Sequence, residues 1–348
     1  MIQIMKKGTQ HPNTFVLTLV MVVSLLANPV LAQQTQETEQ YPVGKPLGLS
    51  TAEGGFNAIS SNVKVYGAIY SAESCSYDPV SGLIVVPNRG APQNVQTNDA
   101  WVSLVNHDGS VHTTQWIGIQ QPNERKSLSP PLVLNQPYGS DIVNGILYVA
   151  DRDGDTGKDD PSVAVIRKFS MQSGKPIGEV RIEGANWIND IEVKEDGTIY
   201  ATQSGEFGVP NPNPDTWKVW KITSAGSATT FVQGAPLNVP NGIAFDPQGN
   251  TVVVNFGNNE VLTFSPAGRL LKTENAAQAG SDGLVIMPDG TKYVSSVVHG
   301  GVSRIRPGES AELIASNIPG AASMCYDPVA NQLVIPMPGS NTLAFVPL

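Results

Sequence analysis

One hairpin phrase recurs six times along this chain of 348 residues, and this repeat restricts the possible folds more than any other feature. The clearest copy, residues 241–255, has a short apolar run, an Asp-Pro-Gln-Gly turn and a second apolar run, which is the pattern of a β-hairpin. The other copies begin at residues 73, 139, 189, 282 and 322, so neighbouring copies start 40 to 66 residues apart. A chain organised in this way is built from repeated β units.

Two further strand-like runs follow the hairpins, which makes four strands in a repeat, and such units are typical of propeller blades. We therefore expect an all-β fold, a six-bladed β-propeller over residues 55–348. The last repeat ends after its third strand, whereas an isolated apolar run at residues 62–66 precedes the first repeat. This N-terminal strand is expected to complete the last blade and close the ring. A β-sandwich is the alternative, but sandwiches seldom repeat one phrase six times.

The first position of the repeats is where we expect the chemistry. Four of the six repeats place a side-chain oxygen there, and these residues are Glu73, Asn189, Asn241 and Asp282. Inner strands of a propeller surround its channel, so the four side chains should converge near the axis on one face. Carboxylate and amide oxygens suit Ca²⁺ better than Zn²⁺, which prefers His or Cys, although Zn²⁺, Mg²⁺ or Mn²⁺ remain alternatives. A competing interpretation makes Asn-Gly and Asp-Gly ordinary turn dipeptides.

This set of residues resembles the calcium-dependent six-bladed propeller hydrolases of the gluconolactonase and senescence marker protein (regucalcin) family. Paraoxonases and diisopropyl fluorophosphatase are more distant relatives of that family. The resemblance covers about residues 55–348. It implies that Glu73, Asn241 and Asp282 bind the metal, that Asn189 touches metal or substrate, and that Asp282 is the base.

The chain departs from this family at two positions. Gluconolactonases place an arginine two residues before the mid-chain asparagine, whereas this chain has Trp187. Paraoxonase-like members follow the aspartate with an asparagine, whereas this chain has Gly283. We expect Trp187 to contact the substrate. Arg125, on the long insertion at residues 118–138, could replace the missing arginine by binding a substrate carboxylate, the alternative being a solvated loop residue.

The reaction expected from such a site is metal-assisted hydrolysis of a lactone or related ester, in which a base activates water. Asp282 is the first candidate base. His299 is the second, because it follows the second strand of its blade, and second strands return to the face that carries the site. A solvated rim histidine is the alternative. Two rival functions are a non-catalytic ligand- or protein-binding propeller with a structural Ca²⁺ site and a phosphotriesterase-like hydrolase.

The N-terminus has the pattern of a secretory signal peptide. Lys6 and Lys7 precede an apolar run at residues 15–27, and small residues at the −3 and −1 positions predict cleavage after Ala32. Residues 1–32 are therefore a signal peptide and residues 33–54 a flexible lead-in, which predicts a secreted or periplasmic protein. The alternative is a retained membrane anchor, but thirteen apolar residues fall short of the roughly 20 that a spanning helix needs.

The charge balance excludes one class of partner. The chain has 30 acidic and 21 basic residues, a net charge of −9, which is the wrong sign for binding a phosphate backbone. We expect no nucleic acid partner, no stable membrane insertion after signal cleavage, a small lactone or ester as substrate, and a monomer.

Two further features leave alternatives open. Cys75 and Cys325 lie in the first and last repeats, which are neighbours in a closed ring. They either form a disulfide or pack as small buried apolar side chains. Asp151, Asp153 and Asp155 have the spacing of a calcium loop, but the glycine and glutamate that usually complete such a loop are missing. That segment is either a second Ca²⁺ site or a solvated acidic turn.

Overall fold

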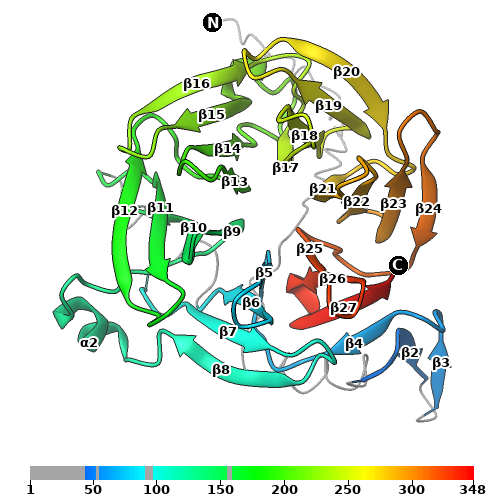
Figure 1. Ribbon diagram of the computed structural model, residues 1–348, viewed down its shortest axis with the longest axis horizontal. Helices are drawn as coiled ribbons and strands as arrows, with labels where there is room; N and C mark the ends of the chain where they lie inside the picture. Colours follow the sequence, from blue (N-terminus) through cyan, green and yellow to red (C-terminus); the bar gives the residue numbers. More distant parts are fainter. Residues whose placement is uncertain (1–43, 52–54, 91–96, 155–158) are drawn as a thin grey trace, which may run out of the picture.

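Six β-sheets surround a central channel in the computed structural model of this protein (Figure 1). The structure describes residues 44–51, 55–90, 97–154 and 159–348. The sheets follow one another around the ring in chain order, and each is antiparallel. The six-bladed β-propeller predicted from the repeat is confirmed.

Blades 1 to 5 each consist of four consecutive strands, of which the first is innermost. Blade 1 contains β5 (Ser76–Asp78), β6 (Leu83–Asn88), β7 (Trp101–Val105) and β8 (Val111–Ile117). Blade 2 contains β9 (Ser140–Val143), β10 (Ile146–Asp153), β11 (Val163–Ser170) and β12 (Pro176–Ile182). Blade 3 contains β13 (Ile191–Val193), β14 (Ile199–Gln203), β15 (Lys218–Ile222) and β16 (Ala228–Gln233).

The remaining blades are built from the last part of the chain. Blade 4 contains β17 (Pro240–Phe245), β18 (Thr251–Asn255), β19 (Glu260–Phe264) and β20 (Leu270–Asn275). Blade 5 contains β21 (Ser281–Ile286), β22 (Lys292–Ser296), β23 (Gly301–Ile305) and β24 (Glu312–Ala315). Blade 6 contains β25 (Cys325–Asp327), β26 (Gln332–Met337) and β27 (Thr342–Pro347) from the C-terminal end.

An N-terminal strand completes blade 6, as the sequence predicts. β4 (Lys64–Tyr66) pairs antiparallel with β27, so the two ends of the chain share one sheet and close the ring (Figure 1). A fifth strand that the sequence did not reveal, β1 (Lys45–Pro46), pairs with β4. Next to it, β2 (Gly48–Ser50) pairs with β3 (Phe56–Ala58).

The expected flexible lead-in is thus wrong for its last part. Leu47 is fully buried among residues of blades 5 and 6, so the chain is anchored well before residue 55. The sequence did not show this because the segment around Leu47 is short and is interrupted by Pro46 and Gly48, so it has no recognisable strand period. The predicted signal peptide, residues 1–32, lies outside the described residues.

The core is divided into six apolar clusters, one at each seam between neighbouring blades. Val253 packs toward blade 3, whereas Val252 and Val254 pack toward blade 5. Because successive strand residues point to opposite faces, and both faces of a blade are covered, the middle strands are continuous apolar runs.

Helices contribute little to the described part of the chain. α2 (Pro122–Ser127) lies outside the ring, and η1 (Pro214–Thr216) and η2 (Pro338–Ser340) are single turns (Figure 1). Within the described ranges, no helix has the length and apolar character needed to cross a membrane.

Candidate functional site

Two of the predicted ligands lie where the pairing of an inner strand is irregular. The register of β17 with β18 shifts between Pro240 and Ile243, which flank Asn241. The register of β21 with β22 shifts in the same way around Asp282. A bulge redirects side chains relative to the regular alternation of a strand. The sequence phrase thus produces the same local irregularity in neighbouring blades 4 and 5.

The glycines that follow these residues serve close packing between blades. A Cβ on Gly242 would lie 2.3 Å from the carbonyl oxygen of Asp282, and one on Gly283 would lie 2.6 Å from the backbone nitrogen of Met324. Both dipeptides lie inside strands. The interpretation of Asn-Gly and Asp-Gly as turn dipeptides is therefore wrong: glycine is required because the next blade leaves no room for a side chain.

Three predicted ligands hold a buried oxygen that has no hydrogen-bond partner among the residues that the structure describes. These atoms are Oδ1 of Asn189, Oδ1 of Asn241 and Oδ1 of Asp282, in residues that are 7%, 4% and 3% exposed. They come from blades 3, 4 and 5, and the amide of Asn241 donates a hydrogen bond to Oδ2 of Asp282 at 3.2 Å. Buried polar atoms are nearly always paired, so three such oxygens at one position of the repeat indicate a ligand.

The fourth predicted ligand, Glu73, is paired with an arginine that the sequence analysis missed. Nη2 of Arg89 lies 3.0 Å from Oε2 of Glu73, and Arg89 is 2% exposed. The guanidinium also stacks 4.4 Å from the centre of the Tyr138 ring, which fixes its position. Arg89 directly follows β6, so the rule that places second-strand ends on this face of the channel could have found it.

Carboxylate charges meet at this end of the channel. Burial raises the pKa of Asp282 well above its usual range, and the negative charges of Glu73 and Asp190 raise it further. Burial likewise raises the pKa of Asp190, the neighbour of Asn189, to about 7. A bound cation would lower the electrostatic cost of carrying these negative charges in a buried place.

We expect Arg89→Met to destabilise the chelated protein and to strengthen its response to calcium. Without the guanidinium, Glu73 faces the other carboxylates with no counter-charge, which should cost roughly 2–4 kcal/mol. The freed carboxylate should then enlarge the rise in melting temperature on adding calcium. Thermal unfolding with and without chelator measures both effects. Arg304→Met removes an exposed pair with Glu312 and should change neither; equal behaviour of the two variants contradicts the role of Arg89.

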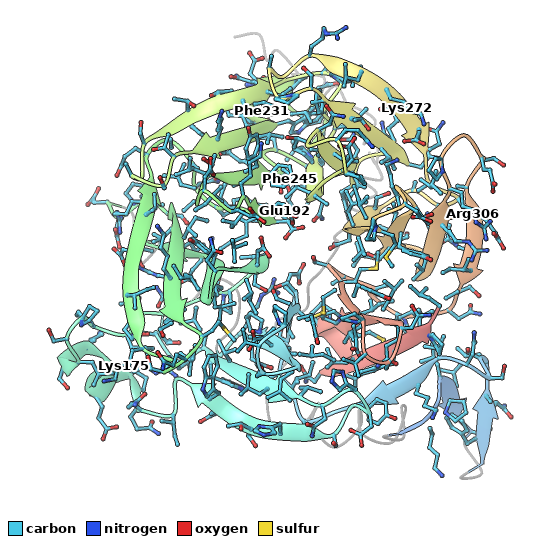
Figure 2. All side chains as sticks on the ribbon, in the orientation of Figure 1. Lys175, Glu192, Phe231, Phe245, Lys272 and Arg306 are labelled. Atoms are coloured by element: carbon cyan, nitrogen blue, oxygen red, sulfur yellow. A yellow bond between two sulfur atoms is a disulfide. The ribbon has the colours of Figure 1, made fainter. Side chains whose placement is uncertain are left out.

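Beyond this rim, the channel contains a cavity of about 220 Å³ lined by residues of all six blades. Asp141 and Glu192 supply its carboxylates, and Glu192 points into the channel in Figure 2. Both oxygens of Asp141 accept backbone N–H groups, from Ile142 at 2.7 Å and from Val193 at 2.8 Å. Burial nevertheless raises the pKa of Asp141 to about 6. The interior of the ring is therefore acidic.

The contribution of Asp141 to the stability of the chelated protein should fall as the pH rises from about 4 to 6. The folded state holds the proton of Asp141 more tightly than the unfolded chain does, so this contribution is full below the unfolded pKa and is lost as the pH rises through the folded pKa. The loss amounts to roughly 2–3 kcal/mol. In a pH series of melting temperatures, Asp141→Asn should change the slope in the direction of greater stability at higher pH, whereas exposed Glu183→Gln should keep the wild-type slope. An unchanged slope in Asp141→Asn contradicts the assignment.

The other predicted site residues are distributed unevenly. Trp187 is half-buried on the rim, with its ring 5.3 Å from that of Tyr138. His299 lies in the exposed turn between β22 and β23, as expected for the rim, and its backbone N–H donates to Oγ of Ser296 at 3.0 Å. Its imidazole makes no hydrogen bond to the four oxygen residues within the described ranges.

Arg125 does not belong to the site. It lies on α2, outside the ring, and is 2% exposed (Figure 1). Its guanidinium donates to the backbone oxygens of Gln120, Ala100 and Gly118. The predicted contact with a substrate carboxylate is therefore wrong, because the donors are used to hold the 118–138 insertion against blade 1. The length and charge of an insertion do not predict the direction in which its arginine side chain points.

The described part of the acidic segment, Asp151 and Asp153, forms ion pairs instead of a calcium loop. Oδ2 of Asp151 accepts from Nε of Arg167 at 3.0 Å, and Asp153 pairs with Arg167 and Arg181. Both aspartates belong to strand β10, and Asp155 lies outside the described residues. A second Ca²⁺ site on these carboxylates is not supported, since two arginines already neutralise them.

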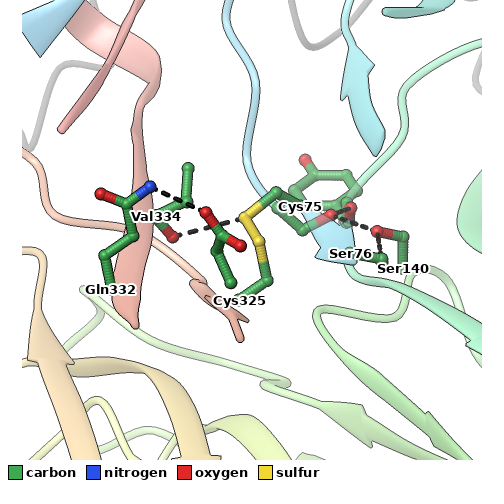
Figure 3. Close-up of a disulfide and its surroundings, with 9 residues drawn as sticks. Cys75, Ser76, Ser140, Cys325, Gln332 and Val334 are labelled. Carbon is green, nitrogen blue, oxygen red and sulfur yellow. Dashed lines mark hydrogen bonds between the residues drawn. A yellow bond between two sulfur atoms is a disulfide. The ribbon is translucent and has the colours of Figure 1, made fainter. Parts of the chain in front are cut away.

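Cys75 and Cys325 form a disulfide that links blades 1 and 6 (Figure 3). Their Cα atoms are 5.5 Å apart, and both residues line the cavity in the channel. Beside the disulfide, Oγ of Ser76 lies 2.8 Å from Oγ of Ser140, which connects blades 1 and 2 (Figure 3). The disulfide alternative for the two cysteines is confirmed, and it fastens the seam at which the ring closes.

A divalent cation fits the residues at the rim. Three unpaired buried oxygens and the carboxylate of Glu73 are hard donors of the kind that Ca²⁺ binds. Within the described ranges, no group of three or more His, Cys, Asp or Glu residues is placed to hold a metal. The four candidate ligands do not form such a group, because two of them, Asn189 and Asn241, are amides. Since the set contains neither His nor Cys, it lacks the ligands that Zn²⁺ prefers.

Fold and site together define a six-bladed propeller whose inner strands gather oxygen side chains at one end of the channel. Residues 162–336, half of the chain, match the SMP-30/Gluconolactonase/LRE-like region, and the chain belongs to this family. No curated protein matches it.

Solved structures share the fold. A gluconolactonase from Xanthomonas campestris is 18% identical, with a TM-score of 0.55 over 82% of this chain and 90% of that chain. Virginiamycin B lyase from Staphylococcus aureus is 12% identical, with a TM-score of 0.54 over 82% of this chain and 99% of that chain. Since one is named a lactonase and the other a lyase, the fold alone does not decide the reaction.

Proposed function

We propose that the protein is an exported, calcium-dependent hydrolase of lactones or related esters. Family membership supports a lactonase-type propeller hydrolase. The observation that carries the proposal is the set of three unpaired buried oxygens, on Asn189, Asn241 and Asp282, at one end of the channel. Buried carboxylates and amides without partners are unfavourable in a protein that binds nothing there.

The proposal assigns separate roles in metal binding and proton transfer to the residues of the site. Glu73, Asn189, Asn241 and Asp282 would hold the cation, which supplies a Lewis acid that polarises the scissile carbonyl. Asp282 is also the proposed base: its carboxylate, whose Oδ2 accepts from the amide of Asn241 at 3.2 Å, would take a proton from a water beside the cation. His299, exposed on the same rim, is the second candidate for proton transfer.

Arg89 has a positioning role in this proposal. Its contact with Oε2 of Glu73 fixes the direction of that carboxylate, while the ring of Tyr138 covers the guanidinium. A positive charge at this distance also limits the repulsion between Glu73 and Asp282, so that the ligand set persists before a cation binds.

The test is a screen of the mature protein against lactones, carboxylic esters and organophosphates, with calcium or chelator. We expect hydrolysis of at least one lactone or ester that needs a divalent cation, with Ca²⁺ compared against Mg²⁺, Mn²⁺ and Zn²⁺. Turnover of organophosphates alone would favour a phosphotriesterase. Calcium stabilisation with no turnover would favour a binding propeller and overturn the proposal.

Export and oligomeric state belong to the same proposal. We expect the mature chain to begin after Ala32, which N-terminal sequencing of the secreted or periplasmic protein would check. The disulfide supports an oxidising compartment. A monomer is expected, and light scattering of the purified protein measures it.

A further inference from the structure

Four aromatic rings form a continuous arc on the rim of blades 2 to 4, made by Tyr138, Trp187, Phe207 and Phe256. Successive ring centres are 5.3, 6.5 and 6.1 Å apart, which is the distance of direct aromatic contact. Arg89 stacks on Tyr138 at one end of the arc. The arc therefore begins at the residue that pairs with Glu73.

The arc follows the same part of the rim as the unpaired oxygens. Trp187 lies two residues before Asn189. Tyr138 directly precedes Gly139, whose N–H donates to the carbonyl oxygen of Asn189 at 2.8 Å. At the other end, the N–H of Phe256 donates to Val239, two residues before Asn241, at 2.9 Å. Each end of the arc is thus tied by backbone to a strand start that carries a candidate ligand.

The loop that carries Phe207 is held by its own polar groups. Oε2 of Glu206 accepts the N–H of Asn213 at 2.9 Å, and the side-chain oxygen of Asn213 accepts the N–H of Asp215 at 3.0 Å. Below them, Nε1 of Trp217 donates to the carbonyl oxygen of Glu206 at 2.9 Å. These three hydrogen bonds hold the loop through groups other than the Phe207 ring.

Phe207 nevertheless stays 44% exposed, at the centre of the arc. The loop's polar contacts do not cover this ring, which leaves it available to a ligand. A rigid, exposed aromatic residue in contact with other rings, next to unpaired oxygens, is a binding surface for an apolar group.

We propose that this aromatic arc binds the part of the substrate away from the reacting bond, and that this part is a flat apolar group, such as an aryl ring fused or attached to the lactone or ester. A substrate of this class would place its carbonyl toward Asn189 and Asn241 and its ring against Trp187 and Phe207. The proposal rests on the hydrolase function proposed above, and it names the substrate class for that site.

The test uses three δ-lactones that share the reacting group: dihydrocoumarin, which carries a fused aryl ring, δ-valerolactone, which has none, and glucono-δ-lactone, which carries hydroxyls. We expect Phe207→Ser and Trp187→Ala to lower kcat/KM for dihydrocoumarin about fivefold and thirtyfold, mainly through KM. Both variants should change kcat/KM for δ-valerolactone less than about twofold. Leu271→Ser, a similarly exposed residue on β20, is the matched control and should change neither substrate.

A binding experiment separates this proposal from the hydrolase function. Calorimetry with 3,4-dihydro-2-quinolinone, the lactam counterpart of dihydrocoumarin, should show binding that Phe207→Ser weakens about fivefold and Leu271→Ser leaves unchanged. Lactam binding of this kind without turnover of any lactone supports the arc and overturns the hydrolase. Turnover with equal losses for all three lactones, a preference for glucono-δ-lactone, or no lactam binding overturns the arc.

Discussion

Asp282→Ala is expected to lower kcat/KM for the best lactone or ester substrate by at least about 10³-fold while the protein remains folded. The substitution removes the oxygen that has no partner and the carboxylate proposed as base in one step. It also takes one charge away from the group formed with Glu73 and Asp190, which raise the pKa of Asp282. Steady-state kinetics and circular dichroism of the purified variant measure the two effects.

Asp282→Asn makes the same test without a change of volume. Burial disfavours the charged form of Asp282, so the neutral amide should leave the melting temperature of the chelated protein equal or higher. The stabilisation by calcium should shrink or disappear. Asp289→Asn, in the exposed turn of the same blade, should keep both activity and calcium response. Full turnover by either Asp282 variant would remove the residue from the mechanism.

Loss of the disulfide between Cys75 and Cys325 should cost roughly 5 kcal/mol, the largest stability effect we expect from any pair of residues. The two cysteines are separated by 250 positions in the sequence, so the cross-link restricts nearly the whole unfolded chain. It also fastens blade 1 to blade 6, where the ring would otherwise be closed by strand pairing of β4 with β27. The melting temperature of a Cys75→Ala/Cys325→Ala protein should be lower by roughly 10 °C.

The control for this prediction is the reductant. Wild-type protein should lose a similar amount of stability when a reducing agent is added before heating, whereas the double variant should not respond. The single variant Cys75→Ala should behave as the double variant does, because either change breaks the same bond. Two free thiols in the unfolded, unreduced wild-type protein, or equal melting temperatures throughout, would show that the seam holds without the cross-link.

The propeller itself was predictable because each repeat encodes its blade locally. Two short apolar runs joined by a turn of a few residues determine a hairpin, and six copies allow few closed arrangements. Even the closing strand at residues 62–66 followed from counting strands, although β4 is confined to Lys64–Tyr66. The anchoring of Leu47 did not follow, because it depends on a surface formed by two distant blades.

The candidate site divides in the same way. Position in the repeat identified the residues whose oxygens lack partners, Asn189, Asn241 and Asp282, and the structure adds that Glu73 is shared with Arg89. The sequence favoured Arg125 over Arg89 as the arginine of the site, because Arg125 lies on a long insertion. In the structure Arg125 is buried against backbone oxygens. An insertion lies outside the repeat. The position of its arginine in the sequence therefore does not predict whether the side chain faces the channel.

The sequence by itself determined the number of blades, the closure of the ring and the residues at the first position of each repeat, because these depend on periodicity along one chain. Only the tertiary structure decided the disulfide, the Arg89–Glu73 pair and the aromatic arc. The disulfide and the arc join residues of different blades, and the Arg89–Glu73 pair joins the two ends of one hairpin in blade 1. Their meeting depends on how the sheets pack around the channel. Packing of that kind is a property of the closed ring and has no counterpart in the pattern of a single repeat.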